Sequence, residues 1–458
     1  MVDTVSDEKV IQGFVESYGA PPAVLIKAPG RVNLIGEHTD YNGLPVLPIS
    51  IPFSIKVAAS PRPDSTVEIR NASPEFRHTT FEIGPDIPHS ETGHWSNYIK
   101  AAAQTIAAQP DGVLRGMNAF FGGDIPNSAG LSSSSALVVA SALAVCAAHN
   151  HDVDLLELAE AMAYGEHYVG TQGGGMDQAI SLLGKKDHAV KIDFFPLRYS
   201  YVSFPKEYSI VVAHSLVRAA KTENALLLYN RRPAECRLAT AVINSLYQAD
   251  TPLQRLGDLY GYRFFTDLAD PRDFVDKTFP HESYTLPDIA GITNESPVTL
   301  TDKYLMTRSG EPLPTPPEGF LIRQRALHVL TEAARVEKSC NALAHNDAVS
   351  FGTLMDASHK SCDEQYGIST PELNALVSIM RKHGALGARL TGAGFGGCAV
   401  GLVPESDVGK VLDGVREDYY NKYLPETRPD LQGSKGFEET LLFAVKPANG
   451  ATVTRLNP

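Results

Sequence analysis

A run of four serines is the clearest chemical pattern in the sequence. Ser132 to Ser135 follow a turn that contains Pro126 and Gly130, and residues 136–148 are almost entirely Ala, Val and Leu. A small, apolar run of this length predicts a buried helix. The first N–H groups of a helix lack internal partners, so serines at its start favour an anion, above all a phosphate. An ordinary capped core helix is the alternative.

A second polar cluster lies between two strand-like runs, residues 24–28 and 43–51. Its polar residues are Arg31, Asn33, Glu37, His38, Asp40, Tyr41 and Asn42. Apolar neighbours in the same loop should pin it against a core, so these side chains point in definite directions. Closely spaced acceptors and donors suit a polyhydroxylated ligand, because each sugar hydroxyl both donates and accepts. A solvated charged turn is the alternative.

A carboxylate beside a glycine turn is the third candidate. Asp177 follows Gly173 to Gly175, which permit a close backbone approach to a ligand, and precedes an apolar helix over 179–183. Such a residue is often only a helix N-cap. Glu166 lies near the end of a helix predicted over 155–169, where a solvated role is the alternative. A further glycine turn, Gly392 to Gly397, is a weak phosphate signal on its own.

The composition narrows the class of protein. With 458 residues, 43% of them hydrophobic and 20% charged, the chain is expected to form two globular domains. A net charge of −13 argues against a nucleic-acid or membrane-surface partner. The five cysteines are scattered without a CxxC pair, which predicts isolated thiols in a reducing compartment. The polar N-terminus and the short apolar runs predict a cytoplasmic protein without a signal peptide.

Hydrophobic periodicity predicts the elements that position these groups. Helices are expected over 6–18, 94–108, 155–169, 233–248, 320–343, 347–359, 371–383 and 408–422. Strands are expected over 117–121, 208–213, 398–403 and 439–445, with a hairpin over 188–205. Pro233 is placed in the first turn of its helix. Residues 253–317, rich in Pro, Asp and Thr, are interpreted as short helices and loops.

Several nucleotide-binding classes are excluded by missing motifs. The sequence has no GxxxxGK[ST] loop, no protein-kinase HRD or DFG motif, and no strand–GxGxxG–helix unit. What remains is a serine-lined helix start, a hydroxyl-binding loop, a glycine-flanked carboxylate and a second glycine loop. Together these features predict ATP-dependent phosphoryl transfer to a sugar.

Three motifs carry a resemblance to a known family. PNSAGLSSSSA resembles the phosphate-binding motif of the GHMP kinases, and LTGAGFGGC resembles their C-terminal glycine motif. GRVNLIGEHTDYNGLPVLP is similar to the more specific galactokinase signature. GGGMDQ, AECRLA and LFAVKP resemble the eukaryotic-type branch, which includes N-acetylgalactosamine kinases. The resemblance runs nearly end to end, apart from the N-terminus and residues 253–317.

The resemblance implies a role for each matching residue. Asp177 would be the base for the anomeric hydroxyl, and Arg31 would stabilise charge at the transferred phosphoryl group. The sugar would be bound by Glu37, His38, Asp40, the backbone of Gly174 and Tyr229. The ATP phosphates would lie against Ser128, Ala129, Gly130, Leu131, Ser132, Ser133 and Ser134. Mg²⁺ would be held by Ser134 and Glu166. Trp95 would lie near the adenine, with core packing as the alternative.

The resemblance also implies the fold and the reaction. The fold class would be α+β, with a ribosomal-protein-like domain over 1–207 and a ferredoxin-like domain over 208–458. The N-terminal domain would have a mixed sheet with helices on one side, and 253–317 would be a variable insertion. ATP and galactose would meet in the cleft between the domains of a monomer and give galactose 1-phosphate. An N-acetylgalactosamine kinase and a non-catalytic sensor of galactose and ATP are the alternatives.

Overall fold

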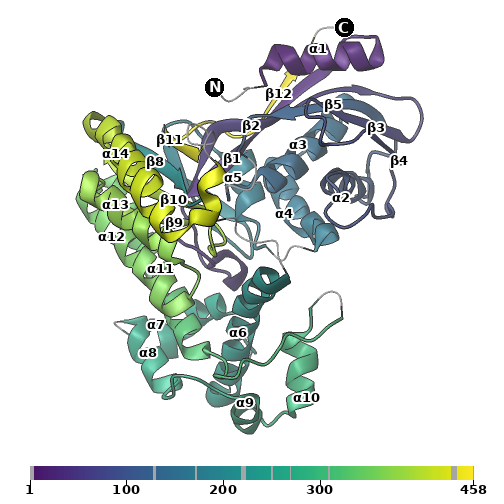
Figure 1. Cartoon of the computed structure of the whole chain (residues 1–458). Helices are drawn as coiled ribbons and strands as arrows, with labels where there is room; N and C mark the ends of the chain where they lie inside the picture. The colour runs from purple at the N-terminus through teal and green to yellow at the C-terminus, as the bar shows by residue number, and fades with distance from the viewer. Residues whose placement is uncertain are drawn as a thin grey trace.

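Two sheets, each covered by helices, organise the computed structural model of the chain (Figure 1). The structure describes residues 5–126, 130–170, 173–217, 223–248, 251–268, 270–307, 310–434 and 441–456. A lobe of short helices lies at the lower end of the view. Among the described residues, we find no helix whose length and apolar character would let it cross a membrane.

The N-terminal sheet is mixed, in the order β12-β1-β2-β5-β3-β4, with β3 and β5 parallel. Its strands are β1 Val24–Asn33, β2 Pro48–Pro61, β3 Thr66–Asn71, β4 Thr79–Glu82, β5 Met117–Gly123 and β12 Thr452–Arg455. Its helices are α1 Asp7–Tyr18, α2 Ser96–Ala107, α3 Ser133–Ala148, α4 Leu155–Gly165 and α5 Met176–Leu183. The short 3₁₀ segment η1 Asp40–Asn42 lies between β1 and β2. The second predicted strand, over 43–51, therefore begins only at Pro48.

Helices cover both faces of this sheet, so the prediction of helices on one side is wrong for α1. Side chains alternate along β1: Val24 and Ile26 join the core formed with α2 to α5, whereas Leu25 joins Val10 and Phe14 of α1. This alternation is the period of two that a strand imposes. Helix α3 is buried all round, as its uniformly apolar composition predicts.

The C-terminal sheet is antiparallel, in the order β11-β8-β10-β9. Its strands are β8 Tyr208–His214, β9 Gly387–Thr391, β10 Cys398–Pro404 and β11 Leu442–Val445. Its helices are α11 Ile322–Ala344, α12 Ala348–Ser361, α13 Pro371–His383 and α14 Val408–Val415. Chain 416–434 continues as the π-helix η7 Arg416–Tyr423, α15 Leu424–Thr427 and the 3₁₀ segment η8 Pro429–Ser434. The single helix predicted over 408–422 is therefore two elements.

One apolar cluster joins the two sheets. Val32 and Ile49 of the N-terminal sheet pack with Val400 and Leu402 of the C-terminal sheet, and all four are fully buried. Burial of this kind contributes roughly 1.5–3 kcal/mol per large side chain. The strand that carries Arg31 is therefore fixed against the domain that carries the C-terminal glycine turn.

The helical lobe is part of the C-terminal core. It comprises α6 Glu223–Tyr247, η3 Leu256–Gly261, α7 Arg263–Thr266, α8 Pro271–Thr278, α9 Leu286–Thr293, α10 Pro297–Leu300 and the π-helix η4 Thr301–Leu305. Leu256, Phe265 and Phe274 from these segments belong to one buried cluster with α6 and α11. The short helices predicted over 253–317 are confirmed, but they pack as core rather than as loose loops.

Two predicted boundaries are wrong: the start of the helix that contains Pro233 and the end of the C-terminal domain. Pro233 lies inside α6, which begins at Glu223, although a proline there removes a backbone donor and crowds the carbonyl four residues earlier. Burial of Leu238 and Val242 later in α6 stabilises the helix despite that cost. The C-terminal unit predicted over 208–458 does not include residues 452–455, because β12 pairs with β1 of the N-terminal sheet. The hairpin of β6 His188–Asp193 and β7 Arg198–Ser203 is confirmed.

Candidate functional site

Arg31 and Asp177 form a bidentate ion pair at the centre of the candidate site. Arg31 Nε lies 2.6 Å from Asp177 Oδ1, and Nη2 lies 3.0 Å from Oδ2. A register shift between Pro29 and Arg31 in the β1–β2 pairing aims the guanidinium at the first turn of α5. The side chain of Arg31 is 7% exposed and that of Asp177 is 26% exposed. The carboxylate is therefore the member of the pair that a ligand can reach.

The guanidinium is held as a permanent cation. Burial alone would lower the pKa of Arg31, but the adjacent Asp177 outweighs burial and the pKa is raised. Arg31 Nη1 also donates to the carbonyl of Gly130 at 2.7 Å, and the Arg31 backbone N–H donates to Leu131 O at 3.1 Å. Leu131 itself is buried in the cluster between the sheets. The serine turn is thus tied to the arginine by backbone contacts.

Ser132 contacts the carboxylate rather than capping the helix. Its backbone is left-handed, with φ 60° and ψ 40°, and its side chain makes no cap hydrogen bond to α3. The hydroxyl instead donates to Asp177 Oδ2. The sequence assigned Ser132 to the phosphates, but in this structure its hydroxyl is engaged by Asp177. Ser128 and Ala129, assigned to the phosphates as well, lie outside the described residues.

The start of α3 leaves polar groups for a ligand. Ser133 and Ser134 are partly exposed, and within the part of the chain that the structure describes neither side chain makes a hydrogen bond. Glu166 is 6% exposed, and its buried Oε1 has no hydrogen-bond partner among the residues that the structure describes. Burial raises the pKa of Glu166 to about 7, against a hydrogen bond from Ser135 that lowers it. An unpaired buried carboxylate oxygen of this kind suits a cation.

Residues 36–43, which we call the hydroxyl loop, connect β1, which carries Arg31, to β2. Glu37 is 1% exposed, and its carboxylate accepts hydrogen bonds from Asn33 Nδ2 and from the backbone N–H of Gly392. Arg389 Nη1 lies 3.4 Å from the same carboxylate. Both oxygens of Glu37 therefore already contact protein donors, which connect the hydroxyl loop to the C-terminal glycine turn. Its sugar-binding role stays a prediction.

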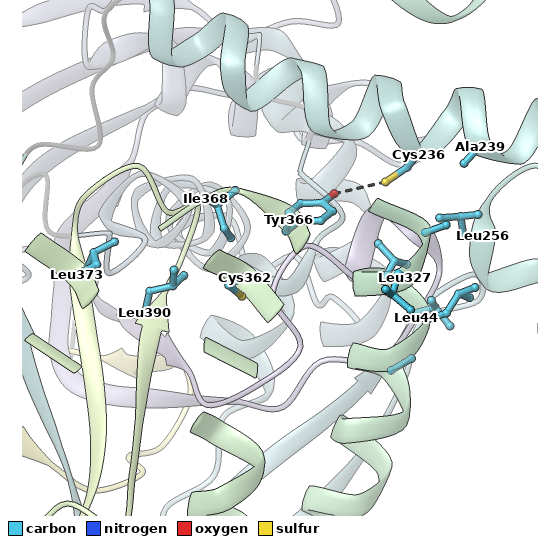
Figure 2. Packing of buried hydrophobic residues seen from close by; sticks show 14 of the residues in the cluster. Leu44, Cys236, Ala239, Leu256, Leu327, Cys362, Tyr366, Ile368, Leu373 and Leu390 are labelled. Carbon is cyan, nitrogen blue, oxygen red and sulfur yellow. Dashed lines mark hydrogen bonds between the residues drawn. The ribbon is translucent and has the colours of Figure 1, made fainter. Parts of the chain in front are cut away.

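His38 begins a directed chain of hydrogen bonds. Its Nε2 lies 3.1 Å from the carbonyl of Ala393, which can only accept, so Nε2 carries the proton. Burial lowers the pKa of His38 to about 3, and the neutral ring must therefore accept at Nδ1 from Tyr41 Oη at 2.7 Å. Tyr41 Oη in turn accepts from Tyr366 at 2.6 Å, which lies 3.4 Å from Cys236 Sγ (Figure 2). Both ring nitrogens of His38 are engaged.

Asp40, Gly174 and Tyr229 gather beside the catalytic candidate. Asp40 Oδ2 accepts from the backbone N–H of Gly174 at 3.1 Å, so the glycine turn and the hydroxyl loop touch. Burial raises the pKa of Asp40 to about 6. The ring of Tyr229 lies 5.6 Å from that of His38. Burial also raises the pKa of Tyr229, with smaller contributions from Asp40 and Asp177.

A buried network behind the hydroxyl loop was missed from the sequence. Glu332 Oε1 accepts from the backbone N–H of Gly36 at 2.9 Å and from Ser358 Oγ, and Oε2 lies 2.6 Å from Arg335 Nε. Burial alone would raise the pKa of Glu332, but Arg335 and its neighbours outweigh it and lower the pKa to about 2. In the sequence, a glutamate and an arginine three residues apart are typical of a solvated helix face, so no local signal pointed to this role.

Trp95 is placed in the core of the N-terminal domain. Its side chain lies between Phe76 and Phe121, with ring centroids 5.6 Å away in each case. Its Nε1 donates to the carbonyl of Arg77 at 3.0 Å, and the residue is 7% exposed. This burial favours the core-packing alternative over stacking on an adenine.

Comparisons with known proteins identify the family of the chain. The family model described as the galactokinase galactose-binding signature matches residues 12–61. The models of the GHMP kinase N-terminal and C-terminal domains match residues 97–185 and 341–421. A galactokinase of Dictyostelium discoideum is 34% identical over 97% of this chain and 93% of its own length. The chain belongs to the galactokinase family. A galactokinase of Saccharomyces cerevisiae is 32% identical over 98% of this chain and 94% of its own.

Solved structures give the same fold. Lactococcus lactis galactokinase complexed with galactose superposes with a TM-score of 0.75 and 26% identity, covering 97% of this chain and 99% of that one. Methanococcus jannaschii mevalonate kinase superposes with a TM-score of 0.54 and 16% identity, covering 93% and 98%, which shows the fold alone. The predicted two-domain GHMP kinase fold is therefore confirmed. Membership of this family makes the chain a sugar kinase that uses ATP.

Proposed function

We propose that the chain transfers the γ-phosphoryl group of ATP to the anomeric hydroxyl of galactose. The observation that carries the proposal is the ion pair of Arg31 and Asp177, whose carboxylate is reachable and lies among polar groups of the hydroxyl loop. A structure of Lactococcus lactis galactokinase with galactose supports the choice of sugar. The products are galactose 1-phosphate and ADP.

In the proposed mechanism, Asp177 accepts the proton of the anomeric hydroxyl. The hydroxyl oxygen then forms a bond to the γ-phosphorus, and the bond from that phosphorus to the β-phosphate oxygen breaks. Arg31 offsets the negative charge near the transferred group, because the adjacent Asp177 carboxylate raises its pKa despite burial and keeps it charged. Phosphoryl transfer depends mainly on positioning and electrostatic stabilisation, and a prearranged pair supplies both.

The hydroxyl loop and its neighbours would bind the sugar. Asp40 offers a carboxylate oxygen, the backbone at Gly174 lies against it, and Tyr229 offers a phenol. A buried site whose polar groups must be paired by sugar hydroxyls discriminates strongly against sugars that leave them unpaired. In this proposal His38 contributes its ring face and Glu37 contributes its contacts to the loop, since their polar atoms already have partners.

Ser134 at the start of α3 and Glu166 at the end of α4 fit a magnesium ion. Glu166 supplies a buried oxygen without a partner, and Ser134 supplies a hydroxyl without one among the described residues. Hard cations prefer such oxygens, and Mg²⁺ takes only one or two from the protein. When bound, the ion would neutralise charge on the ATP phosphates. Gly130, Leu131 and Ser133 would then present backbone N–H groups to those phosphates.

A coupled assay of ADP release tests the substrate. Galactose should stimulate ADP release far more than N-acetylgalactosamine, glucose or glucuronate. A preference for N-acetylgalactosamine would replace the proposed sugar, and no stimulation by any of the four would contradict the kinase mechanism itself.

A substitution tests the base. Asp177→Asn should lower kcat by about 10²–10⁴-fold, the range that general base catalysis supplies, while ATP affinity by calorimetry stays near wild type. Asp193→Asn, at a half-exposed carboxylate in the β6–β7 hairpin beside Lys191, is the matched control and should keep wild-type turnover. Near-normal kcat in Asp177→Asn would contradict the role of Asp177.

A further inference from the structure

The 3₁₀ segment η3 of the helical lobe packs on the hydroxyl loop at Asn42 and Gly43. Gly257, near the start of η3, packs directly on the loop backbone. A Cβ atom at this position would lie 2.5 Å from the carbonyl oxygen of Asn42 and 2.7 Å from that of Gly43. Real Cβ contacts are essentially never this short, so only glycine permits the observed approach. A segment that the sequence treated as a variable insertion is thus in contact with the candidate sugar site.

Arg255 strengthens the same contact. Its guanidinium lies 3.6 Å from the centroid of the Phe195 ring, a stacking distance for a cation on an aromatic face. Its stem covers Gly43, where a Cβ would lie 2.6 Å from Arg255 Cδ. Asp258 accepts from the backbone N–H of Arg255 at 3.1 Å and fixes the start of η3. The loop end at Gly43 is therefore enclosed between η3 and the β6–β7 turn.

Apolar packing anchors this contact on one side. Leu44, which follows the hydroxyl loop, and Leu256 of η3 belong to the same buried cluster as Leu327 of α11 (Figure 2). Leu256 is fully buried and Leu44 is 4% exposed. Because Leu44 and Leu256 on either side of this contact are buried in the core, neither η3 nor the end of the loop can shift easily to relieve a clash at Gly257.

The opposite side of the loop is held by a second glycine. A Cβ on Gly174 would lie 2.4 Å from Tyr41 N and 2.5 Å from the carbonyl carbon of Asp40. The loop itself is strained, since His38 has φ 61°. A non-glycine residue with such a positive φ destabilises the folded state by on the order of 1–3 kcal/mol. It keeps this conformation only where neighbouring residues hold it in place. Gly174 packs on residues 40 and 41, and Gly257 packs on residues 42 and 43, so the two glycines confine successive parts of the loop.

We propose that Gly257 and Arg255 are positioning residues for the sugar. They hold the outer side of the hydroxyl loop so that Asp40 stays in contact with the glycine turn beside Asp177. Residues 255–257 would then set sugar affinity without touching the sugar. This inference rests on the proposed role of Asp40 in sugar binding.

The test compares two glycines of the same 3₁₀ segment. Gly257→Ala should push the loop and raise the KM for galactose by about tenfold, an ordinary cost of overpacking a close contact. The KM for ATP and kcat at saturating galactose should stay within about twofold of wild type. Gly261→Ala is the matched control, because nothing lies within 4 Å of a Cβ there. The proposal would be overturned if Gly257→Ala and Gly261→Ala had the same galactose KM. It would also be overturned if Gly257→Ala raised the KM for ATP as much as the KM for galactose.

Two more variants keep the test decisive. If Gly257→Ala does not fold, Arg255→Ala removes the contact without adding an atom, and it should raise the galactose KM by about threefold to tenfold. A wild-type galactose KM in Arg255→Ala would then overturn the proposal. Asp40→Asn separates the two ideas: if it leaves the galactose KM unchanged, the proposed sugar site is wrong. If Asp40→Asn raises that KM while Gly257→Ala does not, only the positioning role fails.

Discussion

The hydroxyl loop and the start of α3 lie near the same ion pair but are built in opposite ways. In the loop, Thr39 Oγ1 donates to the carbonyl of Gly36 at 2.9 Å and Asn42 Nδ2 donates to that of His38 at 2.9 Å. At the start of α3, the hydroxyls of Ser133 and Ser134 make no hydrogen bond within the described chain. The loop pairs most of its polar groups within the protein and leaves Asp40 for the proposed sugar, whereas the start of α3 leaves two hydroxyls for a ligand.

This difference indicates how the two substrates are recognised. A region whose polar groups are paired within the protein keeps one shape, which suits discrimination among similar sugars. A region of free hydroxyls and backbone N–H groups suits a phosphate chain, because charge attracts it and its oxygens accept from many directions. Mutations that remove the contacts supporting the hydroxyl loop should therefore lower the free energy of unfolding. Mutations at the start of α3 should instead change the KM for ATP or the Mg²⁺ requirement.

Removing a partner from the loop's buried network should give the largest effect. Glu332→Ala leaves Arg335 and the N–H of Gly36 unpaired, and it should lower the free energy of unfolding by about 3–5 kcal/mol. Urea denaturation measures this. Glu337→Ala in the same helix, at an exposed carboxylate beside Lys191, is the control and should cost less than about 1 kcal/mol. Similar losses in both variants would contradict the comparison.

Ser132, which precedes α3 and donates to Asp177, should give the second-largest effect. Ser132→Ala removes a hydrogen bond to the Asp177 carboxylate and should lower kcat by about tenfold, with the KM for ATP unchanged. Ser133→Ala should instead raise the KM for ATP, because its hydroxyl faces no protein partner in the described chain. Steady-state kinetics on both variants measures this. If Ser132→Ala mainly raises the KM for ATP, Ser132 belongs with the phosphates after all.

Lowering the pH should weaken galactose binding, with a smaller effect than the substitutions above. Burial raises the pKa of Asp40 to about 6, so its carboxylate is ionised at pH 7 and becomes protonated as the pH falls through 6. If only the ionised form accepts a sugar hydroxyl, the galactose KM should rise about fourfold between pH 7 and pH 5.5. Asp40→Asn cannot titrate and should give a flat profile. A rise of the same size in Asp40→Asn would assign the dependence to another group.

The smallest effect on stability is expected at the start of α3. Ser134→Ala removes a hydroxyl that has no partner in the described part of the chain, so the free energy of unfolding should change by less than about 0.5 kcal/mol. The Mg²⁺ concentration for half-maximal rate should nevertheless increase, because one proposed ligand oxygen is lost. A magnesium titration of the initial rate measures this. An unchanged magnesium dependence would remove Ser134 from the proposed metal site.

Local sequence patterns predicted helices and strands best where the apolar residues were continuous or strictly alternating. The apolar run after the serines predicted α3, and the alternation in 188–205 predicted the hairpin. The start of α6 was missed because a proline normally ends or begins a helix, and only buried residues beyond it reverse that expectation. Strand β12 was missed because its short, exposed sequence has no hydrophobic pattern to detect.

The candidate site was predictable only as a set of residue types. The sequence pointed to Arg31 and Asp177, and the structure brings them within hydrogen-bonding distance although 146 positions separate them. It could not show that Ser132 turns toward Asp177, because that depends on a left-handed backbone angle. Nor could it show that Glu332 supports Gly36 across 296 positions, since no local rule relates such distant residues.

The pairing of β12 with β1 has a consequence for synthesis. Residues 452–455 form the edge strand beside β1, and their N–H and C=O groups pair with residues 24–27, which would otherwise be an open edge of the N-terminal sheet. While the ribosome is still making the second domain, β1 must wait with that edge exposed, a hazard for association with other nascent chains. The N-terminal sheet is therefore completed only after the strands of the C-terminal sheet have been synthesised.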